Sequence, residues 1–140
     1  MLPRTHRTGT ALAVTAAVLL APGAAHGAQP KPGYYAGEGV DFKIAKFGTR
    51  PQLFRLSLSE TLTCADGTTR ADALDTILIS GPKVSRAGRF KYAAPGVVFK
   101  GRFTSRSQAS GTLSRTDGEC SASLAWAASR KSGGEPLPQG

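Results

Sequence analysis

The sequence predicts an all-β domain of seven or eight strands, either a single antiparallel β-sandwich or, as the alternative, a small closed β-barrel. Three observations support this prediction. Apolar and polar residues alternate with a period of two through several segments, Gly, Pro and Asp-Gly pairs separate these segments, and no segment has the spacing of an amphipathic helix. Short strands joined by tight turns build antiparallel sheets, which pack as sandwiches or close as barrels.

The alternation is clearest in two segments that each contain one of the two cysteines. In residues 54–64 (FRLSLSETLTC), most apolar residues share a parity with Cys64, while Arg, Ser and Thr share the other. In residues 120–129 (CSASLAWAAS), Cys120 and Trp126 share a parity. Such strands bury one face and expose the other, so we expect both cysteines and Trp126 to point into the core.

Similar patterns predict the remaining strands, near residues 34–45, 74–80, 88–92, 97–104 and 107–115. Turn-forming residues separate them, at Asp66-Gly67, Gly81-Pro82, Ala94-Pro95-Gly96 and Asp117-Gly118.

A nine-residue segment occurs twice, as YAGEGVDFK in residues 35–43 and as YAAPGVVFK in residues 92–100, with six identical positions. Each copy reads as a turn that ends in Gly and leads into a strand with Val and Phe on its inner face. We interpret the copies as one structural rule used twice. A duplicated half-domain and a coincidence of strand starts are the two explanations left open.

The N-terminal residues predict a secretory signal peptide. Two arginines precede the apolar run ALAVTAAVLLA, which is too short to span a bilayer, and small residues at Ala25 and Gly27 suit a signal peptidase. We therefore expect a secreted or cell-envelope protein with no transmembrane segment after processing, and a membrane anchor is the alternative. The predicted organisation is a signal peptide in 1–27, a linker in 28–33, the β domain in 34–130 and a disordered tail in 131–140.

The two cysteines favour one disulfide bond. An even pair of cysteines in a small secreted domain usually forms a bridge, and two free thiols or a metal pair are the alternatives. Zinc sites need closely spaced Cys and His ligands, which this sequence lacks.

The chemistry available to the mature domain is restricted. The only histidines, His6 and His26, fall within the predicted signal peptide, which argues against Ser-His-Asp catalysis, Cys-His catalysis and histidine-bound metals. We predict no catalytic residues, no metal and no cofactor. The alternative is a glycoside hydrolase-like enzyme that uses Glu38 and Glu60, which share the inner parity of their strands. Otherwise Glu38 belongs to a turn, and Glu60 sits on a bulge or pairs with an arginine at the edge of the sheet.

A second group of carboxylates, Asp66, Asp72 and Asp75, could supply oxygens to Ca²⁺. Their spacing does not match an EF-hand, and local Asp turns in a solvated loop are the competing interpretation.

The basic residues give the strongest indication of a binding surface. The full chain carries 18 Lys and Arg against 9 Asp and Glu, a net charge of +9. Four cations flank one predicted hairpin turn with aromatic residues on the opposite parity, and two more lie near its ends. The candidate anion-binding residues are Arg86, Arg89, Lys91, Lys100, Arg102 and Arg106.

This hairpin predicts contact with a polyanion such as an anionic envelope polymer. Nucleic acid is disfavoured as the partner, because the aromatic residues needed for base stacking face the core. The competing interpretation is an ordinary exposed β face, on which Lys and Arg prevent aggregation.

Several short motifs resemble a group of small uncharacterised secreted β proteins of high-GC Gram-positive bacteria. The motifs are the Tyr-Gly strand start at 34–39, Cys64 followed by Asp-Gly, GRFKY, FKGRF, SGTL and the closing Cys120 with Trp126. The resemblance covers most of residues 34–130. It implies an extracytoplasmic all-β protein with a Cys64–Cys120 bridge, and it implies no activity.

Together these features predict a secreted, non-catalytic β domain that acts as a binding or structural module through the basic hairpin. The alternatives are the carboxylate enzyme described above and a β-barrel that holds a small ligand.

Overall fold

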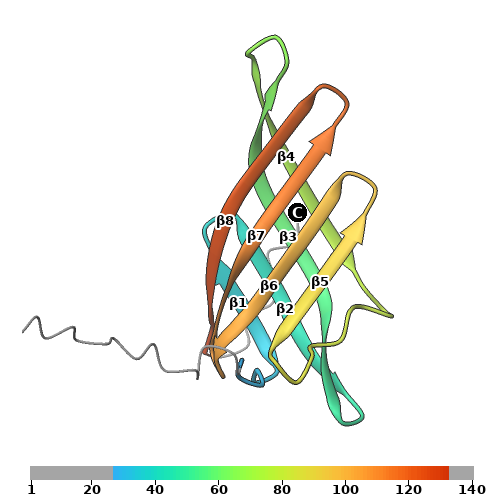
Figure 1. Cartoon of the computed structure of the whole chain (residues 1–140), viewed down its shortest axis with the longest axis vertical. Helices are drawn as coiled ribbons and strands as arrows, with labels where there is room; N and C mark the ends of the chain where they lie inside the picture. Colours follow the sequence, from blue (N-terminus) through green and yellow to red (C-terminus); the bar gives the residue numbers. More distant parts are fainter. Residues whose placement is uncertain (1–26, 133–140) are drawn as a thin grey trace, which may run out of the picture.

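The computed structural model describes residues 27–132, which form eight antiparallel strands (Figure 1). The strands are β1 (Gly33–Gly37), β2 (Val40–Phe47), β3 (Arg50–Cys64), β4 (Thr69–Ile77), β5 (Arg89–Ala94), β6 (Val97–Ser105), β7 (Gln108–Asp117) and β8 (Cys120–Arg130). In the described part of the chain, no helix is long and apolar enough to cross a membrane.

All strands belong to one hydrogen-bonded sheet, in the order β4-β3-β2-β1-β8-β7-β6-β5. Beyond the short β1–β2 hairpin, β3 also pairs with β8, so that Thr63 lies opposite Ser121 and Cys64 opposite Cys120. This extra pairing closes β3, β2, β1 and β8 into a ring, to which the other strands are added (Figure 1). The all-β class and the single disulfide are therefore confirmed, and the curled sheet agrees with the barrel alternative.

The strand order shows two similar halves joined side by side. β1–β4 and β5–β8 are both four-stranded meanders, and β1 pairs with β8 where the halves meet. The repeated nine-residue segments begin both meanders. Tyr35 lies opposite Phe42 in the β1–β2 hairpin, and Tyr92 lies opposite Phe99 in the β5–β6 hairpin. The two copies therefore form equivalent hairpins, in agreement with the interpretation that one turn-and-strand pattern is used twice.

Glycine is needed at the matching turn positions, Gly39 and Gly96. Their φ angles are 72° and 76°, in the left-handed region that favours glycine. The carbonyl oxygen of each glycine accepts a 2.9 Å hydrogen bond from the third strand of its meander, from Ser59 N in one case and Thr116 N in the other. A Cβ atom would approach Ser59 O to 2.6 Å and Thr116 O to 2.4 Å. Each glycine therefore sets both the turn and the approach of the third strand.

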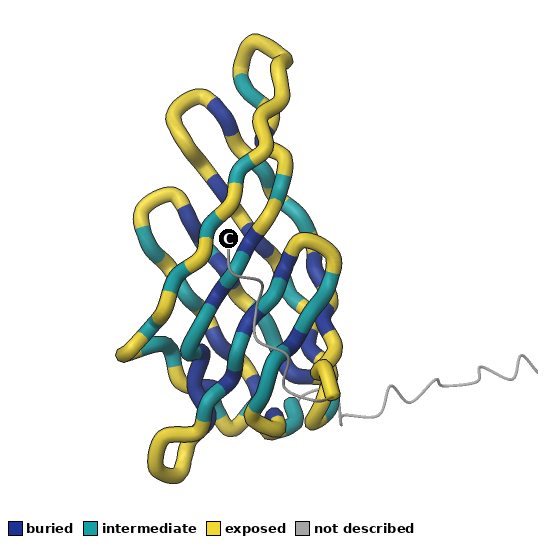
Figure 2. Tube along the Cα trace, turned by 180° about the vertical axis from the view of Figure 1, so that it is seen from behind, coloured by how far each residue is buried: buried dark blue, intermediate teal, exposed yellow. Residues whose placement is uncertain are grey.

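Buried residues concentrate in the lower part of the barrel in Figure 2, while the hairpin ends are exposed. The core contains a cluster of aromatic rings. Phe99 stacks on Trp126 with ring centroids 4.8 Å apart, and Phe42 packs edge-on against Trp126 at 5.6 Å. Trp126 is only 4% exposed, which confirms its expected inward orientation. The other rings of the cluster belong to Tyr35, Phe90 and Phe103. These rings occupy the interior, so this part of the core does not support the alternative of a β-barrel that holds a small ligand.

Two predicted strand ranges were wrong. The single strand expected over 34–45 is two strands, β1 and β2, because the turn at Gly39 reverses the chain. The strand expected over 74–80 runs instead from Thr69 to Ile77, because β4 pairs with β3 from the tight turn onward, starting with Thr63 opposite Thr69.

The segment predicted as a linker, residues 28–33, lies against the end of the sheet. Ala28 N donates to Phe103 O at 3.1 Å, and Lys31 N donates to Arg106 O at 2.9 Å. Most of the predicted signal peptide and most of the predicted tail lie outside the described residues.

Candidate functional site

The basic hairpin predicted from the sequence is the β5–β6 hairpin. Its register places Arg89 opposite Arg102 and Lys91 opposite Lys100. These four residues alternate with Phe90 and other buried residues, so their side chains leave the outer face of the sheet. The fold therefore brings the four cations together on one surface.

These cations line a surface groove of about 580 Å³, which we call the basic groove. A Cβ atom on Gly101 would lie 2.4 Å from Trp126 Cζ2, so the Trp126 ring packs directly beneath this part of the groove. The full lining consists of Pro82, Lys83, Arg89, Phe90, Lys91, Lys100, Gly101, Arg102, Ser110, Gly111 and Thr112. The groove thus combines five cationic side chains with two hydroxyl groups over an aromatic core.

The four hairpin cations of the basic groove face one another across the strands. Like charges directly opposite each other on neighbouring strands destabilise a sheet, and here two such pairs are adjacent. Within residues 27–132, no ion pair joins any of the groove cations to an acidic side chain. Arg102 Nε is also buried without a hydrogen-bond partner in this part of the chain. An anion bound in the groove would satisfy these groups.

The other two predicted anion-binding residues lie apart from the basic groove. Arg86 lies in the loop before β5 and borders a separate hollow with Arg50. Arg106 lies in the β6–β7 turn, where its carbonyl oxygen accepts a 3.0 Å hydrogen bond from the Tyr35 hydroxyl. Both residues therefore flank the open end of the hairpin, and neither lines the groove.

Glu38 and Glu60 line one hollow of about 500 Å³, between β3 and β8 beside the β1–β2 turn. Glu38 is exposed in the turn, whereas the Glu60 side chain is only 4% exposed. Both Glu60 carboxylate oxygens are covered and make no hydrogen bond within the described residues. A general acid must reach the oxygen that it protonates, so this arrangement lacks the open access that a glycosidase needs.

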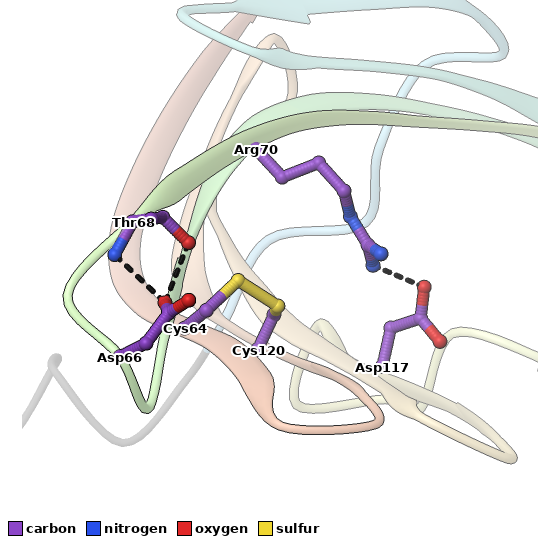
Figure 3. Close-up of a disulfide and its surroundings, with 6 residues drawn as sticks. All are labelled: Cys64, Asp66, Thr68, Arg70, Asp117 and Cys120. Carbon is purple, nitrogen blue, oxygen red and sulfur yellow. Dashed lines mark hydrogen bonds and ion pairs between the residues drawn. A yellow bond between two sulfur atoms is a disulfide. The ribbon is translucent and has the colours of Figure 1, made fainter.

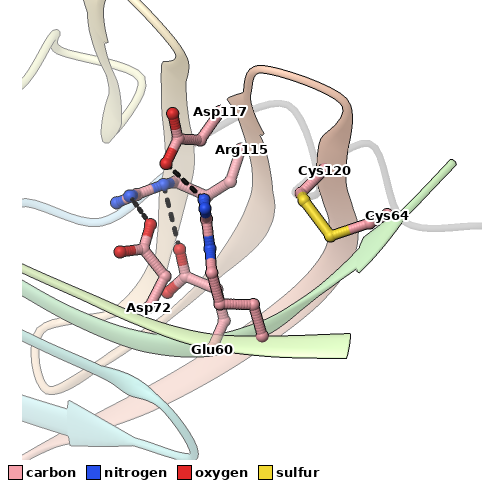
Figure 4. A network of polar contacts seen from close by, with 7 residues as sticks. Glu60, Cys64, Asp72, Arg115, Asp117 and Cys120 are labelled. Carbon is pink, nitrogen blue, oxygen red and sulfur yellow. Dashed lines mark hydrogen bonds and ion pairs between the residues drawn. A yellow bond between two sulfur atoms is a disulfide. The ribbon is translucent and has the colours of Figure 1, made fainter. Parts of the chain in front are cut away.

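Glu60 belongs to a buried charge cluster with Asp72 and Arg115 (Figure 4). Arg115 Nε lies 3.0 Å from Glu60 Oε1, an ion pair without the alignment of a hydrogen bond, and Arg115 Nη2 bonds to Asp72. Burial raises the pKa of Glu60 above its usual value, against the lowering effect of Arg115, and Asp72 raises it further. The pairing of Glu60 with an arginine was one of the sequence interpretations, but it occurs inside the barrel rather than at its edge.

The three aspartates considered for Ca²⁺ have separate partners. Asp66 accepts hydrogen bonds from Thr68 N at 3.0 Å and Thr68 Oγ1 at 2.6 Å, which lower its pKa (Figure 3). Asp75 accepts a two-pronged contact from Arg55, at 3.0 and 2.7 Å, which lowers the Asp75 pKa. In residues 27–132, no three His, Cys, Asp or Glu side chains form a group that could hold a metal ion.

The Cys64–Cys120 disulfide joins β3 of the first meander to β8 of the second (Figure 3). Beside it, Arg70 on β4 pairs with Asp117 on β7. The bridge and this ion pair connect the two meanders at the end of the barrel away from the aromatic core.

Sequence reasoning missed Ser110 and Thr112 in the basic groove and Arg115 in the charge cluster. The first two lie opposite Arg102 and Lys100 because of the β6–β7 register. Arg115 shares the inner parity of Leu113, and an arginine at such a position is a signal for a buried ion pair.

No family model, curated protein or solved structure matches the chain.

Proposed function

We propose that this protein is a secreted, non-catalytic module that binds anionic polymers of the cell envelope or its surroundings through the basic groove. The observation that carries the proposal is the pair of uncompensated like-charge contacts, Arg89 with Arg102 and Lys91 with Lys100, in one groove. Such pairs cost stability in the free protein, and a bound polyanion would remove that cost.

The corresponding lysine of the first meander supports this interpretation. Lys43 follows the same Val-x-Phe sequence as Lys100, but Tyr34 lies opposite it where Lys91 lies opposite Lys100. Lys43 Nζ stands 5.1 Å from the centre of the Tyr34 ring and 5.5 Å from that of Phe54. The same hairpin position therefore holds a lysine that packs on aromatic rings in the first meander, and a lysine that faces another lysine in the second.

The test is retention on an immobilised polyanion. We expect the parent protein to bind heparin at low salt and to elute as salt screens the contacts, whereas the double variant Lys100→Glu/Arg102→Glu should not be retained. Its melting temperature should stay close to that of the parent, because the new glutamates face Lys91 and Arg89 and replace repulsion with attraction.

The matched control is Lys46→Glu/Arg50→Glu, which changes the net charge by the same amount at exposed positions of the β2–β3 hairpin. We expect this variant to keep most of its retention. If both variants elute like the parent, the cations only solvate the surface. If both lose retention equally, net charge alone governs binding and the groove has no special role.

A further inference from the structure

Four of the five cations of the basic groove form two parallel rows across the strands. Arg89, Arg102 and Ser110 make one row, and Lys91, Lys100 and Thr112 make the other, because the pairing of β5, β6 and β7 aligns them. The rows are two residues apart along each strand, which corresponds to about 6.8 Å in an antiparallel sheet. The groove therefore presents one pair of arginines and one pair of lysines at a fixed spacing.

Each row has the groups that bind a phosphate. Arginine binds phosphate oxygens with two parallel hydrogen bonds, and lysine binds them as a compact charge. Arg102 Nε is a buried donor with no hydrogen-bond partner within residues 27–132. The hydroxyl groups of Ser110 and Thr112 are exposed at the end of each row and add further donors.

The groove lacks the surfaces that recognise nucleobases. Phe90, Phe99 and Phe103 are at most 4% exposed, and the floor between the rows is formed by Gly101 and Gly111. Single-stranded nucleic acids are held by exposed aromatic side chains on which bases stack. A small linker between phosphates, such as a polyol, suits a flat glycine floor better than a base does.

We infer that the basic groove binds a linear polyol phosphate, with two successive phosphodiester groups seated on the two rows. This inference rests on the proposed function and specifies its ligand class. Two linked phosphates engage both rows at once, so binding gains from the effective concentration of the second group.

The experiment compares synthetic tetra(glycerol phosphate) with glycerol 3-phosphate by isothermal titration calorimetry at low salt. We expect the tetramer to bind at least about ten-fold tighter than the monomer. The variants Arg102→Gln and Lys100→Gln each weaken one row, and each should bring the tetramer affinity close to that of the monomer. The control variant Lys46→Gln should leave both affinities unchanged.

Two further probes separate phosphate spacing from charge and from base recognition. Inorganic polyphosphate carries its charges closer together, and oligo(dT) carries bases; both should bind more weakly than the tetramer at equal phosphate number. Equal affinities for tetramer and monomer, or tighter binding of either probe, would overturn the inference. If this happens while heparin retention still depends on Lys100 and Arg102, the proposed function survives without the phosphodiester specificity. If heparin retention does not depend on Lys100 and Arg102, both the proposed function and this inference are wrong.

Discussion

Lys43 and Lys100 occupy the same position in two copies of one hairpin, yet their surroundings differ. Lys43 packs over Tyr34 and Phe54, and nearby Arg55 pairs with Asp75 on the same outer face. Lys100 faces Lys91 and has no acidic partner within residues 27–132. In the first meander Lys43 and Arg55 therefore have partners within the sheet, whereas in the second meander Lys91 and Lys100 face each other. The comparison shows that one hairpin design supports two different outer faces, because the residues opposite the lysine differ between the two copies.

The largest effect should come from removing the bridge that joins the two meanders. We expect Cys64→Ala/Cys120→Ala to lower the free energy of unfolding by about 4 kcal/mol, because the bridge closes a loop with a sequence separation of 56. Urea denaturation of the variant and the oxidised parent measures the difference. A loss below about 1 kcal/mol would show that β3–β8 pairing alone holds the meanders together.

A smaller effect should appear at the two equivalent turn glycines. Gly39→Ala and Gly96→Ala should each cost about 2 kcal/mol or more, because alanine is strained at these φ angles and its Cβ meets a backbone carbonyl. Thermal or urea unfolding measures both variants.

The matched controls for the glycines are Gly67→Ala and Gly118→Ala. They also have positive φ, at 85° and 60°, but have open space around the Cβ position. We expect a cost of only about 1 kcal/mol at each control. If Gly39→Ala and Gly96→Ala differ strongly from each other, the two hairpins are not equivalent in energy.

The smallest effect should distinguish the two lysines themselves. Lys43→Ala should lower stability by about 0.5–1 kcal/mol because it removes the contacts with Tyr34 and Phe54. Lys100→Ala should leave stability unchanged or raise it slightly, because it relieves repulsion from Lys91. Chemical denaturation at low salt measures both changes. An equal loss in the two variants would mean that Lys100 has a stabilising partner after all.

Much of the local structure follows from the residues alone. A period of two assigns each side chain to a face, so the inward positions of Cys64, Cys120 and Trp126 could be predicted without knowing which strands are neighbours. The hairpin at Ala94-Pro95-Gly96 is equally local, because a tight turn brings the strands on either side into contact. The four hairpin cations of the basic groove could be grouped for this reason, whereas Lys83, the fifth cation of the groove, lies outside the hairpin.

Contacts between distant segments depended on the tertiary structure. The alternation that places Glu60 and Arg115 on inner faces does not specify that β3 and β7 approach each other across the barrel. That approach follows from the pairing of β1 with β8 and from the closure of β3 onto β8. Strand alternation is a property of one strand, whereas sheet order and curvature arise when the whole apolar face is buried at once. The sequence by itself therefore determined the all-β class, the inward faces of the cysteines and Trp126, and the basic hairpin. Only the folded sheet decided the division of residues 34–45 into two strands, the ring, the buried charge cluster and the full lining of the groove.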